Sequence, residues 1–158
     1  MGGKKLSSNI GLRFERHLYE MMVEHGFFPV FEPKSWQQKL NEKRNGDQVP
    51  DLFFEYEGVQ FWVDCIYRSN FKGNHLELYY TDECLSRDKA YQELSDPLFI
   101  AVGVSGTPEN PDTFLFDYHA YFNVHSMSRD RWGSVSTHFR GDFIEHKVRE
   151  TLIKKQLI

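Results

Sequence analysis

The sequence predicts a single α/β domain, in which a mixed sheet with a central antiparallel hairpin is flanked by helices. Apolar residues recur at three- and four-residue steps near both ends of the chain, a hairpin pattern lies between them, and a near-continuous apolar run spans residues 98–104. The length of 158 residues, 40% of them hydrophobic, suffices for one well-buried core but not for two ordinary domains. We expect one domain over residues 1–158, with its core at about 9–122 and a C-terminal helical extension at about 143–158.

The first part of the chain predicts a helix followed by a short strand. Residues 9–25 form an amphipathic helical pattern, with Ser7, Ser8 or Asn9 as the cap and Gly26 at the end. The apolar run 27–31, which ends before Pro33, predicts the first strand. The polar segment 34–47 predicts a long loop, or a short helix followed by a loop.

Beyond a central hairpin at residues 50–68, the pattern predicts alternating helical and strand segments. The expected elements are a turn at 69–74, a helical stretch within 81–94, a buried strand at 98–104, a loop at 105–112, a strand at 113–118, an irregular segment at 123–142 and a last amphipathic helix at 143–158. Phe114, Phe116 and Tyr118 recur at strand spacing, so we expect them in the core and not on a base-stacking surface.

The hairpin is expected to turn at Glu57 and Gly58, which fixes the pairing of its two strands. One face is then wholly apolar, and the other carries polar and aromatic pairs that end in two acids. The apolar pairs are Tyr56–Val59, Phe54–Phe61 and Leu52–Val63, and the opposite pairs are Glu55–Gln60, Phe53–Trp62 and Asp51–Asp64. Glu-Gly is a weaker hairpin signal than Asn-Gly, but a slip of one residue would mix the two faces.

Asp51 and Asp64 are the most informative pair in the chain. Directly opposed residues in a hairpin have Cβ atoms about 4.5–5.5 Å apart, and two like charges repel at that distance. A cation between them explains the arrangement, and converging carboxylates suit a hard, oxygen-seeking ion such as Mg²⁺. The alternative is that two unrelated surface acids fall opposite each other by chance.

The order helix, strand, hairpin, helix, strand, with Pro50-Asp51 and then Asp64-Cys65-Ile66 on adjacent hairpin strands, resembles the PD-(D/E)xK nuclease superfamily. These restriction-endonuclease-like enzymes include Holliday-junction resolvases. The resemblance covers residues from about 9 to about 118. It implies a restriction-endonuclease-like sheet and a DNA endonuclease that hydrolyses phosphodiester bonds with the help of a metal ion.

The resemblance also implies which residues form the site. It assigns one or two Mg²⁺ or Mn²⁺ ions to Asp51, Asp64 and the main-chain carbonyl of Cys65. Glu15, within Phe14-Glu15, matches the acid on the first helix that often completes such a site. The other reading of Glu15 is a solvated helix glutamate.

Ile66 departs from the superfamily pattern, because it occupies the position of the lysine that normally contacts the scissile phosphate and the attacking water. The loss of one charge-stabilising donor typically lowers the rate about a hundred- to thousandfold. Arg68, on the same strand face, is a candidate replacement, although arginine stays protonated and cannot act as a base. Lys72, Lys34 or Lys89 could instead reach the site from a neighbouring element. The alternative function is a catalytically inactive nuclease-like domain that acts as a nucleic-acid-binding or regulatory module.

The charge pattern and the two cysteines suggest partners and a cellular location. Lys34, Lys39, Lys43 and Arg44 directly precede the site and could line a groove for a nucleic-acid backbone, although such a run is also typical of a solvated loop. The net charge of -4 argues against broad binding of the histone kind. Two cysteines and no membrane-length apolar run predict a cytoplasmic protein without a disulfide framework. The sequence leaves a homodimer open, with the last helix and exposed aromatic residues as its candidate surface.

Overall fold

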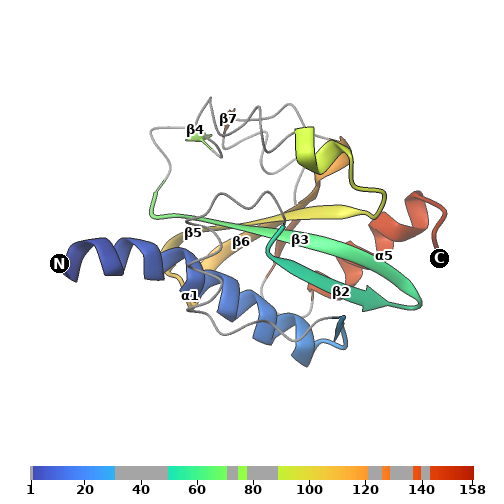
Figure 1. Ribbon diagram of the computed structural model, residues 1–158, viewed down its shortest axis with the longest axis horizontal. Coiled ribbons are helices and arrows are strands. Elements are labelled where there is room, and N and C mark those ends of the chain that lie inside the picture. The colour runs from blue at the N-terminus through green and yellow to red at the C-terminus, as the bar shows by residue number, and fades with distance from the viewer. Residues whose placement is uncertain are drawn as a thin grey trace.

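The computed structural model describes residues 2–30, 50–70, 75–77, 89–120, 126–128, 137–139 and 143–158. Six strands form one mixed sheet in the order β1-β2-β3-β5-β6-β8, and β4 and β7 form a separate two-stranded ribbon. Only β3 and β5 pair in parallel among these strands. In Figure 1, α1 lies along one side of the sheet and the β4–β7 ribbon lies on the other. The predicted α/β architecture, with a central hairpin in a mixed sheet, is confirmed.

Helix α1 spans Gly2–Glu24 and is followed by the short strand β1, Phe28–Pro29. The helix starts earlier than predicted, so residues 7–9 lie within it and do not cap it, because Gly2 to Leu6 continue the helical backbone. Its end is as predicted, since Gly26 adopts a φ of 90°, which favours glycine. Strand β1 is shorter than the predicted run 27–31, and residues 31–49, with the predicted polar loop, lie outside the described part of the chain.

The central hairpin consists of β2, Leu52–Tyr56, and β3, Val59–Arg68. Its pairs run from Leu52 opposite Val63 to Tyr56 opposite Val59, which confirms the predicted register. Glu57 and Gly58 have φ angles of 49° and 82°. Two central residues with positive φ are typical of a two-residue turn whose twist matches the strands, so the turn holds the register.

Strand β5, Leu98–Thr107, and strand β6, Asn110–Asp117, form a second hairpin beside β3. The predicted loop at 105–112 is wrong, because both strands continue through it to a tight turn. A register shift between Val104 and Thr107 absorbs the irregular backbone at Ser105 and Gly106. The glycine and proline residues of this segment therefore mark a bulge and a turn, and not a long loop.

The last part of the chain adds short strands and a helix. Strands β7, Ser126–Ser128, and β8, Thr137–Phe139, lie within the segment predicted to be irregular, so that prediction is wrong there. Strand β8 pairs with β6, and β7 pairs with β4, His75–Glu77. A 3-10 turn, Tyr118–Ala120, follows β6, residues 89–92 are helical, and helix α5 spans Phe143–Lys154. The rest of the helical stretch predicted within 81–94 lies outside the described residues.

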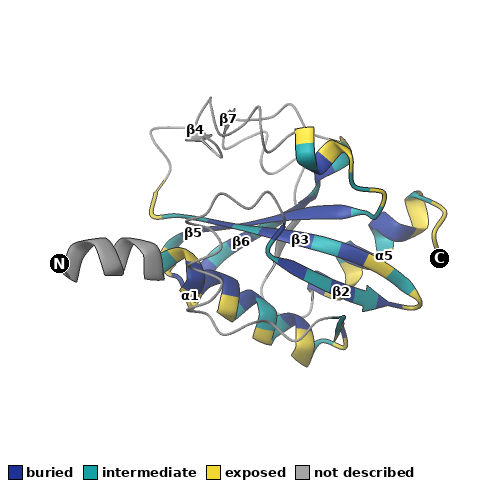
Figure 2. Cartoon of the chain, in the orientation of Figure 1, coloured by how far each residue is buried: buried dark blue, intermediate teal, exposed yellow. Residues whose placement is uncertain are grey.

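The sheet separates two apolar cores. The core beneath α1 and α5 is rich in aromatic side chains, among them Phe14, Phe54 and Phe61, and α5 contributes Ile144, Val148 and Leu152. The core on the opposite face contains Ile66, Ile100, Val102, Phe116 and Tyr118. Figure 2 shows the buried side of α1 facing the sheet and the exposed side facing away. The prediction that the β6 aromatic residues are core residues is confirmed, whereas Leu157, expected on the buried face of the last helix, is exposed.

No helix in the described part of the chain has both the length and the apolar character of a membrane span.

Candidate metal centre

Asp64 lies on the sheet face opposite α1, in one of a series of cross-strand rows. The last pair between β2 and β3 is Leu52–Val63, so Asp51 directly precedes the paired residues, and Asp64 continues to Ile100 on β5 and Phe116 on β6. The next row toward the hairpin turn contains Phe53, Trp62 and Leu98, and the next row in the other direction contains Ile66, Val102 and Phe114. The row of Asp64, which we call the acid row, is therefore bordered by an apolar row on each side.

A hydrogen bond joins Asp51 to the neighbouring strand at the acid pair. The backbone N–H of Cys65 donates to Asp51 Oδ2 at 2.9 Å. Strand β2 begins at Leu52, so this carboxylate takes the place of a backbone acceptor just beyond the end of the ladder. The N–H and C=O of a strand residue point to the same edge, so the Cys65 carbonyl also faces Asp51. The hydrogen bond brings the Asp51 carboxylate to the Asp64–Cys65 peptide.

The acids differ in their exposure to solvent. Asp51 is half-buried, Asp64 is only 5% exposed, and Glu15 on α1 is fully buried. The reading of Glu15 as a solvated glutamate is wrong, because the helix turns this carboxyl toward the sheet together with Phe14. A buried carboxylate requires compensating partners, since an uncompensated charge in the interior is strongly unfavourable.

The described residues hold no group of three or more histidine, cysteine, aspartate or glutamate side chains that could bind a metal ion together. A metal ion at the acid pair would therefore be held by two carboxylates and the Cys65 carbonyl, with water and substrate oxygens in the remaining positions. Two protein carboxylates are a usual complement for Mg²⁺, which keeps several of its waters. The oxygen-donor set of this pair fits the ion.

Ile66 is 6% exposed and packs in the core opposite α1. Its side chain lies on the same strand face as that of Asp64, as the two-residue period predicts. Its neighbours across the sheet are Val102 and Phe114. Ile66, at the position that carries lysine in the nuclease pattern, is thus part of an apolar row.

The candidate cations for this position have different locations. Arg68 is half-buried at the end of β3, two residues beyond Ile66, and its Nη1 donates to the carbonyl of Tyr67 at 3.0 Å. Lys89 is exposed at the start of the described helical residues 89–92. Lys34, Lys39, Lys43, Arg44 and Lys72 lie outside the described part of the chain.

An ion pair that sequence patterns do not reveal ties α1 to the β5–β6 turn, beyond the C-terminal end of β3. Arg13 binds both carboxylate oxygens of Glu109, with Nη2 2.8 Å from Oε2. Arg13 lowers the pKa of the Glu109 carboxyl, chiefly through these hydrogen bonds. The Tyr67 hydroxyl donates to the carbonyls of Ser105 and Gly106, and burial raises the pKa of this phenol. These contacts hold α1 over β3. Arg13 and Glu109 are 96 positions apart in sequence, so no local pattern predicts their ion pair.

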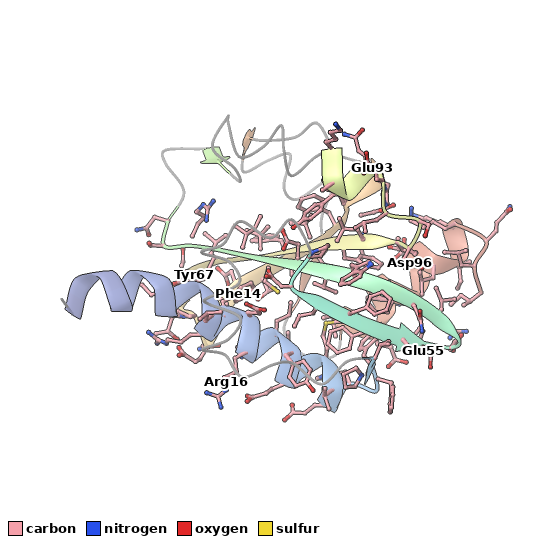
Figure 3. The ribbon with its side chains drawn as sticks, in the orientation of Figure 1. Phe14, Arg16, Glu55, Tyr67, Glu93 and Asp96 are labelled. Carbon is pink, nitrogen blue, oxygen red and sulfur yellow. The ribbon has the colours of Figure 1, made fainter. Side chains whose placement is uncertain are left out.

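Figure 3 shows the side chains between α1 and the sheet. Phe14 points from α1 toward Tyr67 on β3, and Arg16 points away from the sheet. The two rings have centroids 6.0 Å apart. Phe14 and Arg16, two positions apart on the helix, thus face the core and the solvent, and Glu15 is buried like Phe14.

The fold is restriction-endonuclease-like, with its hairpin, its parallel β3–β5 pair and its flanking helices. The chain is similar in structure to Hjc, a Holliday junction resolvase from the archaeal hyperthermophile Archaeoglobus fulgidus. The TM-score is 0.52 with 14% sequence identity, over 81% of this chain and 95% of the resolvase. No protein-family model and no curated protein sequence matches the chain. The predicted resemblance in fold is thus confirmed. The sequence identity is too low to transfer the function of the resolvase to this chain.

Proposed function

We propose that this protein is a metal-dependent phosphodiester hydrolase of the DNA endonuclease type. The observation that carries the proposal is the hydrogen bond from the Cys65 amide to Asp51, which brings the Asp51 carboxylate to the Asp64–Cys65 peptide. Asp64 itself is 5% exposed, so both acids adjoin one peptide at the end of the β2–β3 ladder. The fold, which is that of a nuclease superfamily, agrees with this reading.

In this proposal, Asp51, Asp64 and the Cys65 carbonyl hold Mg²⁺ or Mn²⁺. The ion supplies an activated water and stabilises charge on the phosphoryl oxygens. The Cys65 amide orients the Asp51 carboxylate, because it occupies one of its oxygens and directs the other. The buried Glu15 carboxyl lies on α1, and the described residues include no group of three acids that joins it to Asp51 and Asp64.

The remaining roles follow from charge and position. Arg68 is proposed to contact a substrate phosphate from the end of β3, and Lys34, Lys39, Lys43 and Arg44 to contact the nucleic-acid backbone. These cations position the substrate and carry no sequence specificity. We also propose a cytoplasmic location, and a homodimer would allow two strands to be cut.

The second candidate function is an inactive nuclease-like module that binds nucleic acid or regulates a partner. The observation that favours it is the burial of Ile66 at the lysine position, in a row with Val102 and Phe114. Isoleucine supplies neither a positive charge nor a proton donor to the phosphate. Such a domain would bind metal and nucleic acid but would not turn over.

Cleavage assays separate the two functions. The full chain is incubated with Mg²⁺ or Mn²⁺ and with single-stranded, duplex and branched DNA, beside Asp51→Asn, Asp64→Asn and the double variant. The hydrolase proposal predicts cleavage that requires the metal and is lost in each Asn variant, because the amide removes a ligand charge without changing the shape.

Glu20→Gln is the matched control, since Glu20 is an exposed acid on α1. It should cut like the wild type. Cleavage that survives in the double Asn variant contradicts the metal-site proposal. A wild type that binds DNA and metal without cutting indicates the inactive module.

A further inference from the structure

Three aromatic side chains lie on the same face of the hairpin as the acid pair, toward the turn. Phe53 and Trp62 are direct cross-strand partners, and Phe28 on β1 pairs with Glu55 in the next row. Phe28 is 67% exposed, the highest value among the large apolar residues in the described part of the chain. Phe53 and Trp62 are both half-buried. We call these three residues the aromatic strip.

The Phe53 and Trp62 rings pack against each other. Their centroids are 4.2 Å apart, with an interplanar angle of 38°. Trp62 also packs against the core opposite α1, and its backbone N–H donates to the Pro97 carbonyl at 2.8 Å. One side of the indole is therefore held by the protein, which leaves little rotamer freedom to lose when a ligand binds.

Cross-strand packing accounts for part of the strip only. Aromatic partners in a hairpin stabilise the strands, which explains the contact between Phe53 and Trp62. It does not explain Phe28, whose ring remains two-thirds exposed at the sheet edge. An exposed aromatic residue that continues a half-exposed aromatic pair is typical of a binding surface.

The position of the strip suggests what it binds. The Phe53–Trp62 row is two residues from the acid row, or about 6.6 Å along the strands. This distance is comparable with the step from a phosphate to a neighbouring base in an extended single strand. Glu55 lies between Phe28 and Gln60 in the last row, and its negative charge disfavours a phosphate on that side. An unpaired base has an uncharged ring, so Glu55 does not repel it in this way.

We propose that the aromatic strip is a stacking platform for an unpaired base of single-stranded DNA next to the acid pair. Stacking on aromatic side chains tolerates any base, because each base has a π face. The proposal rests on the proposed function, to which it adds a substrate class: DNA with unpaired nucleotides beside the cleavage point. A continuous duplex would keep its bases stacked on each other and could not use the strip.

Binding measured without metal tests the platform independently of cleavage. Fluorescence anisotropy of a labelled oligo-dT strand, and of a duplex of mixed sequence with the same length, is recorded with the full chain in EDTA. The wild type should bind the single strand more tightly than the duplex. Trp62→Leu, which keeps apolar bulk but removes the π face, should raise the Kd for the single strand about 5- to 100-fold, and Phe53→Leu should act in the same direction.

Two further variants separate stacking from folding. Trp62→Phe should restore most of the affinity, because it keeps a π face. Phe28→Ala alters a largely exposed side chain and should weaken single-strand binding without loss of structure. Tyr19→Leu is the matched control, since Tyr19 is a half-buried aromatic residue that stacks on Phe54 on the other side of the sheet, and it should bind like the wild type.

The outcomes distinguish this inference from the proposed function. Equal affinity of wild type, Trp62→Leu and Phe28→Ala for the single strand overturns the platform, even if Asp51 and Asp64 prove necessary for cleavage. A wild type that prefers the duplex overturns it as well. Loss of binding in the strip variants in a protein that never cuts DNA supports the platform and refutes the hydrolase.

Discussion

Asp64 and Ile66 are two residues apart on one strand face, and both are almost fully buried. Asp64 adjoins the peptide whose N–H binds Asp51, whereas Ile66 packs among apolar side chains. Burial of an aspartate is unfavourable unless hydrogen bonds or a cation compensate it, while burial of isoleucine is favourable by about 1.5–3 kcal/mol. Strand β3 thus has the aspartate of the nuclease pattern, whose burial is unfavourable, but isoleucine at the position of the lysine.

Ile66→Lys restores the missing cation. We expect metal-dependent DNA cleavage to rise by about a hundred- to thousandfold, because the ammonium group can reach a phosphate held beside Asp64. The free energy of unfolding should fall by about 1.5–3 kcal/mol, since the apolar contacts of Ile66 are lost. A cleavage time course and thermal unfolding of the same preparation measure both effects.

Ile66→Met is the control for the packing change, since methionine fills the site without a charge. It should leave cleavage at the wild-type level. If the Met variant gains as much activity as the Lys variant, the missing charge is not the cause of weak cleavage.

The residue patterns predict part of this site. Two-residue periodicity and the Glu57-Gly58 turn suffice to pair β2 with β3 as far as Leu52 and Val63 and to place Asp64 and Ile66 on the same face. The hydrogen bond from the Cys65 amide was not predictable, because it depends on β2 starting at Leu52 and leaving that donor to a side chain. The burial of Glu15 depends on how α1 is rotated against the sheet, which Phe14 and Gly103 determine through a long-range contact.

At the scale of the elements, α1 approaches β5 closely at Gly103. A Cβ atom on Gly103 would lie 2.6 Å from Cε1 of the Phe14 ring, which is itself fully buried. The absence of a side chain at this position therefore leaves room for the Phe14 ring. This contact determines the height of α1 above β3 and, with it, the position of Glu15.

Gly103→Ala should lower the free energy of unfolding by about 1–3 kcal/mol, because the added methyl group overpacks the contact with Phe14. Gly11→Ala, in the exposed part of α1 with no heavy atom near its Cβ position, should instead raise it by about 0.5–1 kcal/mol. Urea unfolding of both variants measures the difference. Equal effects of the two substitutions would show that the helix does not rest on Gly103.

His17 on α1 makes the stability of the helix contact sensitive to acid. Burial lowers the pKa of its imidazole from 6.5 and outweighs the attraction of Glu109, Glu20 and Glu24. The folded state therefore binds the proton less well than the unfolded chain, so the contribution of neutral His17 is present above pH 6.5 and is lost as the pH falls below it. His17→Gln should weaken the decrease in unfolding free energy between pH 7 and pH 5, as measured by urea titrations. An unchanged pH slope contradicts this role.

The elements differ in how well local sequence predicts them. Long segments such as α1, α5, β3 and β5 were predictable because their apolar residues recur with the period of a helix or strand, or form a continuous run. Strands β7 and β8 have three residues each, too few to display a period, and they exist because they pair with distant strands. The β5–β6 turn was taken for a loop because glycine and proline mark tight turns and long loops alike.

At the scale of the whole molecule, the acid pair lies where β2 stops beside the sheet centre. Strand β3 continues past this point and is flanked on its other side by the parallel strand β5. Beyond the end of β2, the Asp51 carboxylate occupies the Cys65 amide at this edge of β3.

We propose that Asp51 and Asp64 bind one divalent cation together. Isothermal titration of the full chain with Mn²⁺ tests it without any assumption about substrate or activity. We expect one site per chain in the wild type and in Glu20→Gln, and at least about tenfold weaker binding in Asp51→Asn and in Asp64→Asn, because each loses a charged oxygen ligand. Wild-type affinity in both Asn variants would contradict the claim.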